Sequence, residues 1–178
     1  MPGVAYKPKY TIEDYLDWEG DWELWDGVAV SMSPSPSIKH QRISRRLVLQ
    51  FDPQLKADEC DDLCELFFEC DWHVDQYTVV RPDGIIVCGD NDTDFIEDTP
   101  ILIAEILSPS TRKKGLTAKR ELYALHGVPF YLILDPEAKS ATLLQLDSEG
   151  AYRDVAPEEP FELHPGCNLQ LEVAPLFA

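Results

Sequence analysis

Short apolar runs bounded by turn residues set the hydrophobic pattern of this chain. Residues 85–88, 101–107 and 130–134 are rich in branched and aromatic side chains, which is typical of strands buried on both faces of a sheet. Asp26-Gly27 separates two further apolar runs, and Ser148-Glu149-Gly150 separates another two. These turn signals predict one β-hairpin near each end of the chain. Residues 66–74 and 77–80 are two further predicted strands.

Two segments in the first third of the chain have the start signals of helices. Thr11 can cap a short helix that ends near residue 16, and Ser37 can cap a longer one over residues 38–57. The apolar side of the longer helix consists of Ile43, Leu47 and Phe51. Pro53 is expected to kink this helix or end it early.

A third helix opens after residue 111 and ends at Gly127, with a proline two residues beyond as a stop signal. Its apolar stripe consists of Ala118, Leu122 and Leu125. Lys119 lies on the flank of that stripe, so its stem can lie against the fold while its ammonium reaches the edge of the sheet.

Two strands, a helix and a further strand follow one another between residues 78 and 134. A helical crossover makes the last two strands parallel, whereas the hairpins are antiparallel. The predicted fold class is therefore α/β, with a central mixed β-sheet flanked by helices and with N-terminal and C-terminal β-hairpins. We expect residues 1–178 to form a single domain, with residues 161–178 packed on the edge of the sheet.

The charge of the chain restricts its partners. It carries 33 acidic and 15 basic residues, a net charge of −18. Such a surface repels phosphate backbones, which counts against a simple nucleic-acid-binding module. A bound metal ion, or the basic segment 112–114, can reverse the field at a small site, so an enzyme that acts on nucleic acid is not excluded. The segment is equally well explained as a solvated loop.

Five cysteines in a chain without a signal-peptide pattern predict reduced thiols and a cytoplasmic location. No apolar run is long enough to span a bilayer, so we expect a soluble protein. Cys60, Cys64 and Cys70, followed by His73, suggest a zinc site, but their spacing lacks tight C-x-x-C pairs. We therefore expect ordinary buried thiols.

Two carboxylates belong to the predicted buried strands. Asp83 precedes the run 85–88, and Glu105 lies inside the run 101–107. An unpaired buried charge is strongly unfavourable, so Glu105 should be neutral, paired with a cation or bound to a metal. The backbones of neighbouring strands are about 5 Å apart, so the two carboxylates can hold one hard divalent ion such as Mg²⁺. Lys119 follows closely enough to fold back over the strand end.

Each of these residues also has a simpler structural explanation. Asp83 can be an ordinary turn residue, and Glu105 can form a structural ion pair with Lys119. Lys119 alone is typical of a surface lysine whose stem lies on the fold. Glu23, next to tryptophans, can be a solvated strand residue, and His40 can be a satisfied polar residue near the core.

A series of short motifs follows in order between residues 10 and 155. They are Tyr10-Thr11-Ile12-Glu13-Asp14-Tyr15, Glu23-Leu24-Trp25-Asp26-Gly27, Met32-Ser33-Pro34 with His40, Arg81-Pro82-Asp83, Glu105-Ile106-Leu107-Ser108-Pro109-Ser110-Thr111, Lys119-Arg120-Glu121-Leu122-Tyr123, Gly127-Val128-Pro129 and Asp135-Pro136. With these motifs the chain resembles the Uma-two family, described as putative restriction endonucleases, within the PD-(D/E)xK nuclease superfamily.

The resemblance implies a restriction-endonuclease-like fold and hydrolysis of DNA phosphodiester bonds with Mg²⁺ or Mn²⁺. The implied catalytic residues are Glu23, Asp83, Glu105 and Lys119, with Asp83 and Glu105 as the metal ligands. The implied supporting or substrate-contacting residues are His40, Ser108 and Arg112. Lys119 would orient or deprotonate the attacking water, and Glu23 would complete the acidic cluster or hold Lys119.

Two positions depart from the superfamily pattern. A lysine usually stands two residues after the second acid, and that position is Leu107 here, so Lys119 from the next helix must replace it. An acidic residue often precedes the family's lysine, and the aligned position is Gly115.

Hypotheses from different functional classes follow. The first is a metal-dependent DNA endonuclease, with DNA as substrate, no membrane partner and a possible homodimer whose two sites cut opposite strands. The second is a catalytically silent nuclease-fold protein that acts as an interaction or assembly module, which the acidity of the chain favours. A third is recognition of a small anion at residues 108–111, at the start of the predicted third helix.

Overall fold

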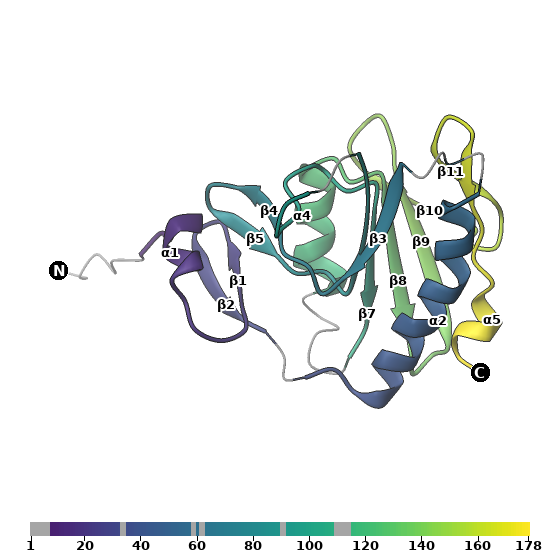
Figure 1. The fold of residues 1–178 in the computed structure, drawn as a ribbon, viewed down its shortest axis with the longest axis horizontal. Coiled ribbons are helices and arrows are strands. Elements are labelled where there is room, and N and C mark those ends of the chain that lie inside the picture. The colour runs from purple at the N-terminus through teal and green to yellow at the C-terminus, as the bar shows by residue number, and fades with distance from the viewer. Residues whose placement is uncertain (1–7, 33–34, 58–59, 61–62, 90–91, 109–114) are drawn as a thin grey trace.

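A six-stranded sheet forms the centre of the protein, and a four-stranded sheet lies beside it (Figure 1). This is a computed structural model, and it describes residues 8–32, 35–57, 60, 63–89, 92–108 and 115–178. The chain passes from the small sheet to the large one through residues 81–83. Residues at this passage are therefore close to both sheets.

The large sheet has the strand order β10-β9-β8-β7-β6-β3. Its strands are β3 (Cys64–Phe68), β6 (Gly84–Cys88), β7 (Leu102–Ile106), β8 (Phe130–Asp135), β9 (Ser140–Leu146) and β10 (Tyr152–Val155). β7 and β8 are parallel, and the other neighbours are antiparallel, so the sheet is mixed, as predicted. Gly84 of β6 lies opposite Ala104 of β7, which brings the start of β6 next to the end of β7.

The small sheet has the order β2-β1-β5-β4. Its strands are β1 (Trp22–Trp25), β2 (Val28–Ser31), β4 (Trp72–Asp75) and β5 (Thr78–Val80). Asp26 and Gly27 both have positive φ, 46° and 78°, as a tight hairpin turn requires, so the predicted N-terminal hairpin is confirmed. The short helix α1 (Ile12–Leu16) precedes it, and Thr11 caps α1 with a reciprocal hydrogen bond to Asp14.

The prediction of one strand over residues 66–74 is wrong. Glu69 has a φ of 51°, in the left-handed region that non-glycine residues seldom adopt, and the strand breaks there. The part before the break is β3, at the edge of the large sheet, and the part after it is β4, at the edge of the small sheet. The turn at Glu69 thus transfers the chain between the two sheets.

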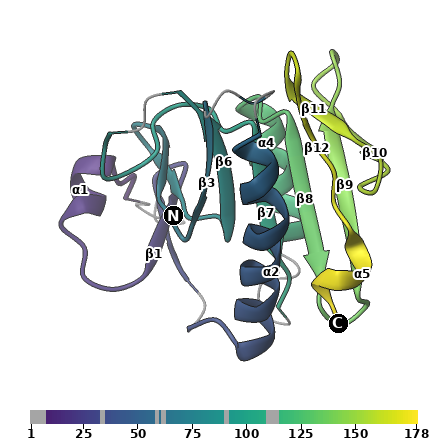
Figure 2. The same cartoon turned by 45° about the vertical axis from the view of Figure 1, so that its right-hand side comes forward.

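Helix α2 (Ile38–Leu55) packs on one face of the large sheet (Figure 2). Ser37 caps it, and Ile43, Leu47 and Phe51 are buried, as predicted. Pro53 lies inside its last turn, and the helix ends two residues later. Described residues include no helix with the length and apolar character needed to cross a bilayer.

The C-terminal segment packs against α2, not only along an edge of the sheet. It consists of β11 (Phe161–His164), β12 (Cys167–Leu169) and α5 (Val173–Leu176). Its apolar side chains share one core with α2, β7 and β8. The side chains of Gln50 and Gln54 on α2 bond the backbone of Glu172 and Gln170, which satisfies polar groups of a segment with few ladder partners. The expectation of edge packing is corrected accordingly.

The opposite face of the large sheet is covered by a π-helical turn, η2 (Gly115–Lys119), and by α4 (Arg120–Leu125). The predicted inward stripe of this helix is wrong at Ala118 and Leu125, which are exposed, whereas Leu122 packs against the core as predicted. Leu125 is 81% exposed, whereas Lys119 is 8% and Tyr123 is 0% exposed. The lysine and the tyrosine face inward because both side chains bond Glu105 in the sheet.

The expectation of free thiols is also wrong for four of the five cysteines. Disulfides join Cys60 to Cys167 and Cys64 to Cys88, and Cys70 alone is free. Cys64 and Cys88 lie directly opposite each other in the β3–β6 ladder, and β12 brings Cys167 to the end of α2. Cys60 and Cys64 therefore have different partners, which removes the zinc alternative.

Alkylation should detect one reactive thiol in the unfolded, unreduced protein and five after reduction. The reason is that the two disulfides leave only Cys70 as a thiol. Intact mass after labelling in denaturant, with and without reductant, measures both counts. The Cys70→Ser variant should take up no label before reduction. Five labels on the unreduced wild-type protein would show that the disulfides do not form.

Candidate active site

Three buried, oppositely charged side chains meet where the two sheets join. The Nζ of Lys119 lies 2.8 Å from Oε1 of Glu105 and 3.0 Å from Oε1 of Glu23. Glu23 comes from β1, Glu105 from β7 and Lys119 from η2. Their exposed fractions are only 5%, 7% and 8%. The small sheet, the large sheet and the crossover helix thus each contribute one charge to a buried ion triad.

Asp83 lies at the solvent-accessible side of this triad. Its Oδ2 accepts a hydrogen bond of 2.6 Å from the backbone amide of Ile106, the residue after Glu105. Its Oδ1 lies 3.0 Å from Nε2 of His40, on the first turn of α2. The side chain of Asp83 is 23% exposed. The structure therefore brings the two predicted metal-ligand positions onto adjacent strand ends and adds His40 beside them.

Glu23 is fixed on both of its carboxylate oxygens. Oε1 accepts from the backbone amide of Arg81, at 2.9 Å, as well as from Lys119. Oε2 accepts from the indole Nε1 of Trp25, at 3.2 Å. Because Arg81 belongs to the passage between the sheets, Glu23 ties that passage to the lysine.

Tyr123 belongs to the same buried cluster, although the sequence pattern assigns it no role. Its hydroxyl donates a hydrogen bond of 2.7 Å to Oε1 of Glu105, the oxygen that also pairs with Lys119. The available signal was its spacing: Tyr123 follows Lys119 by four residues, which places both on one helical face. Its phenol alone resembles an ordinary core aromatic.

Burial and unbalanced charge shift the protonation of the site. Burial raises the pKa of Glu105 to about 7, and Asp83 and Glu23 add to this, although Lys119 opposes it. Burial disfavours the charged form of Lys119, but Glu105 and Glu23 outweigh it and raise the pKa of this lysine. Burial lowers the pKa of His40, but the hydrogen bond and the charge of Asp83 raise it by more, so the net effect is a raised pKa. Carboxylates are therefore in excess over cations here.

The two departures from the superfamily pattern have a structural account. Leu107 is 6% exposed and lies in the apolar core, and its amide donates to the carbonyl of Leu134. The ammonium that lies beside Glu105 instead belongs to Lys119. Gly115 is the first residue of η2. Ser108 follows, half-buried, beyond the end of β7. Arg112, the basic segment 112–114 and residues 109–111 of the proposed anion site lie outside the described residues.

The donor set fits a magnesium-like ion in part. Within the described ranges, no three side chains of His, Cys, Asp or Glu form a group that could hold a metal by themselves. Mg²⁺, however, commonly binds one or two carboxylates and keeps its remaining ligands as water. Asp83 and Glu105 are two such hard oxygen donors on adjacent strands, and the bonds from Lys119 and Tyr123 both fall on Oε1 of Glu105.

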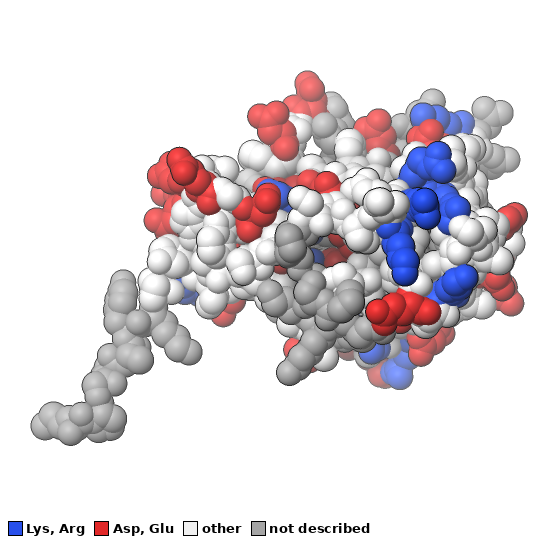
Figure 3. Space-filling model, turned by 90° about the horizontal axis from the view of Figure 1, so that it is seen from below, with Lys and Arg blue, Asp and Glu red and all other residues white. Residues whose placement is uncertain are grey.

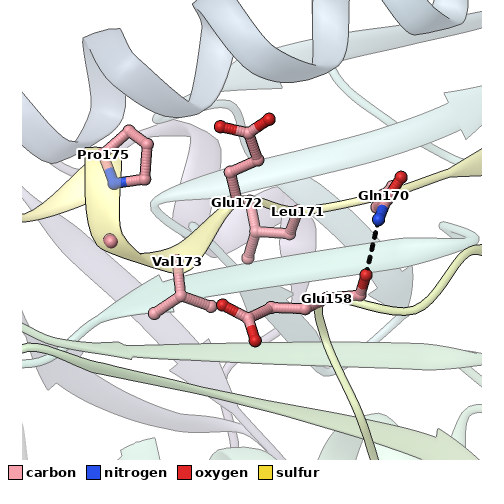
Figure 4. A pocket seen from close by; sticks show the side chains of 7 residues that line it. Glu158, Gln170, Leu171, Glu172, Val173 and Pro175 are labelled. Atoms are coloured by element: carbon pink, nitrogen blue, oxygen red, sulfur yellow. Dashed lines mark hydrogen bonds between the residues drawn. The ribbon is translucent and has the colours of Figure 1, made fainter.

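A surface pocket elsewhere does not involve these residues. It is lined by Glu158 and by residues 170–175, next to α5 (Figure 4). Across it, Nε2 of Gln170 donates to the backbone carbonyl of Glu158 at 2.7 Å. None of the converging site residues lines this pocket, so it is separate from the candidate active site.

The mixed sheet with its flanking helices is the fold of the restriction-endonuclease-like class. The family model described as "Uma2: Putative restriction endonuclease" matches residues 12–174, and the chain belongs to this family. The chain is 29% identical over 154 residues to the "Uncharacterized protein slr1290" of Synechocystis sp. (strain ATCC 27184 / PCC 6803 / Kazusa), which covers 82% of this chain and 78% of that protein. The predicted family is thereby confirmed.

A solved structure shows the same fold. It is described as that of "a putative nuclease belonging to DUF820 from Anabaena variabilis ATCC 29413". The likeness has a TM-score of 0.74 at 17% sequence identity and covers 94% of this chain and 97% of the other. The predicted fold class is therefore confirmed as well.

Proposed function

We propose that this protein is a metal-dependent DNA endonuclease that hydrolyses phosphodiester bonds. The observation that carries the proposal is the buried Lys119, held against Glu105 on the strand next to Asp83. A lysine that is 8% exposed and placed beside two strand-end carboxylates is poorly explained as a surface residue. Membership of a family described as "Putative restriction endonuclease" supports the same conclusion.

Asp83 and Glu105 would hold Mg²⁺ or Mn²⁺, which when bound polarises a phosphate oxygen and lowers the pKa of a coordinated water. The partly exposed Asp83 leaves room for substrate on one side, whereas Glu105 lies on the buried side. His40 orients Asp83 through its Nε2. Tyr123 orients Glu105 through its hydroxyl.

Lys119 would act as a cation more than as a base. Two carboxylates at 2.8 and 3.0 Å stabilise its ammonium form. An ammonium donates hydrogen bonds to the attacking water and to phosphate oxygens, and it offsets negative charge that grows in the transition state. Glu23 would then be a positioning residue, because it holds the ammonium and is itself fixed by Arg81 and Trp25.

The alternative is a catalytically silent member of the fold that acts as an interaction or assembly module. One observation favours it: Lys119 pairs with both Glu23 and Glu105, so the two buried acids have a counter-charge that the protein itself supplies. The two functions differ in whether the carboxylates bind a divalent ion and whether that ion supports cleavage.

A homodimer, a cytoplasmic location and a single domain over residues 1–178 stay predictions.

Mn²⁺ titrated by calorimetry should bind the wild-type protein and bind the Asp83→Asn variant at least about tenfold more weakly. The variant loses one anionic donor but keeps the shape of the side chain. Asp154→Asn is the matched control, because Asp154 is an exposed carboxylate on β10, at the far edge of the large sheet. Equally negligible heats for wild type and Asp83→Asn would remove the proposed function.

Plasmid nicking in Mg²⁺ completes this test. Wild type and Asp154→Asn should convert supercoiled plasmid to the nicked form, and Asp83→Asn should not. A metal site that is lost in Asp83→Asn, without any nicking by wild type, would favour the silent module instead.

A further inference from the structure

The outward face of α2 carries a concentrated basic patch in an acidic chain. The patch, called here the basic face, consists of Lys39, Arg42, Arg45 and Arg46. These are four of the 15 basic residues of the protein, within a stretch of eight. No acidic residue occurs on α2 before Asp52. The first two-thirds of the helix therefore carries a positive charge, although the net charge of the protein is −18.

The helical spacing separates this face from the core. At 3.6 residues per turn, Arg42 and Arg45 fall on the side opposite to Leu47 and Phe51, and Lys39 and Arg46 fall on the flank between that side and Ile43. Lys39, Arg42 and Arg45 are exposed. Arg46 is half-buried, and one of its guanidinium nitrogens donates to the carbonyl of Leu176 at 3.0 Å. Three long cationic side chains thus project from a rigid, well-packed helix.

Within the described part of the chain, the exposed members of the basic face have no anionic partner. Among the carboxylates of the described residues, none forms an ion pair with Lys39, Arg42 or Arg45. Other surface cations do have one: Lys56 pairs with Asp52, and Arg153 pairs with Asp147. The charge of the basic face is therefore available to an external anion.

The basic face begins at the candidate active site. Lys39 immediately precedes His40, whose Nε2 lies 3.0 Å from Oδ1 of Asp83. The first turn of α2 thus directs one residue inward to the site and its neighbours outward to solvent. In Figure 1 the first turn of α2 lies at the bottom of the molecule. Figure 3 views the molecule from this side, and the Lys and Arg side chains gather on one part of the face that it shows.

We infer that the basic face binds the phosphate backbone of the nucleic-acid substrate and holds the strand against Asp83. This inference rests on the proposed function, because it places the same substrate at the same site. An acidic protein that binds DNA needs a local positive surface to overcome long-range repulsion. Arginine suits this role because its planar guanidinium bonds two phosphate oxygens at once.

Fluorescence anisotropy of a labelled 20-base-pair DNA duplex in EDTA tests the inference without cleavage. The test variant is Arg42→Gln/Arg45→Gln, and the control is Lys56→Gln/Arg153→Gln, which removes the same charge elsewhere on the surface. The test variant should bind at least about tenfold more weakly at low salt. Its slope of log K against log salt should be smaller by about two, because two phosphate contacts are lost. The control should resemble wild type.

The inference would be overturned if the test variant bound the duplex as tightly as wild type, or if wild type did not bind the duplex at any salt concentration. It would also be overturned if the test and control variants were weakened to the same extent, since only the net charge of the protein would then matter. Cleavage in Mg²⁺ decides the proposed function separately. A wild type that cleaves, with a test variant that binds normally, refutes the basic face and leaves the nuclease standing. If the test variant binds more weakly but wild type does not cleave, the basic face stands and the proposed nuclease function is refuted.

Discussion

Replacing Lys119 with alanine is expected to slow DNA cleavage by roughly 10²- to 10³-fold while DNA binding stays near the wild-type level. The ammonium lies 2.8 Å from Glu105 and is buried, so neither a surface lysine nor water can take its place with the same geometry. DNA binding should persist because the exposed cations of α2 remain. Single-turnover cleavage in Mg²⁺ and anisotropy in EDTA measure the two quantities.

Loss of folding has to be separated from loss of chemistry in this variant. Without Lys119, Glu23 and Glu105 are two buried acids with no counter-charge, and breaking such a buried pair costs about 3–5 kcal/mol. The double variant Lys119→Met/Glu23→Gln removes one acid together with the ammonium and should regain most of that stability. It should remain as inactive as Lys119→Ala. Wild-type cleavage by the stable double variant would show that the lysine has a structural role only.

In the absence of metal, the free energy of unfolding should fall as the pH rises from about 4.5 to about 7. The pKa of Glu105 is about 7 in the folded protein against an ordinary value of 4.5, so the fold favours the protonated carboxyl. This stabilisation is fully present below 4.5 and is lost as the pH rises through 7. The slope contributed by one such group reaches about 1.4 kcal/mol per pH unit. The raised pKa of His40 acts in the same direction above 6.5.

Urea unfolding in EDTA over this pH range measures the effect. Glu105→Gln should flatten the curve between pH 5 and 7, because an amide keeps the side-chain shape but does not titrate. Glu65→Gln, an exposed acid on β3, should leave the curve unchanged. An identical pH dependence in wild type and Glu105→Gln would contradict the assigned protonation of the site.

Local signals predict much of the fold and indicate the main candidate residues of the site. Asp26-Gly27 marks the first hairpin by turn chemistry alone, and the buried runs mark β6, β7 and β8. Glu105 could be found because a carboxylate in a β-branched run needs a partner. The parallel pairing of β7 and β8 follows from the helix between them.

The features that the sequence did not reveal depend on long-range contacts or on unusual backbone. The left-handed turn at Glu69 has no glycine to mark it, so the apolar pattern predicts one strand where the structure has two. The Cys60–Cys167 disulfide joins residues 107 positions apart, and spacing cannot show that they meet. Tyr123 and Lys119 face inward because Glu105 bonds both, which outweighs the helix's apolar periodicity.

The division of the ion triad between the two sheets has an evolutionary consequence. Glu105 lies on β7 of the large sheet and Asp83 directly precedes β6, but Glu23 belongs to the first hairpin, and it holds Lys119 from that side. A descendant whose hairpin diverged would keep both candidate ligands and lose the anchor of its ammonium. Under the proposed function, homologues without catalysis are therefore best sought among those that vary at residues 22–31, even where Asp83 and Glu105 are intact.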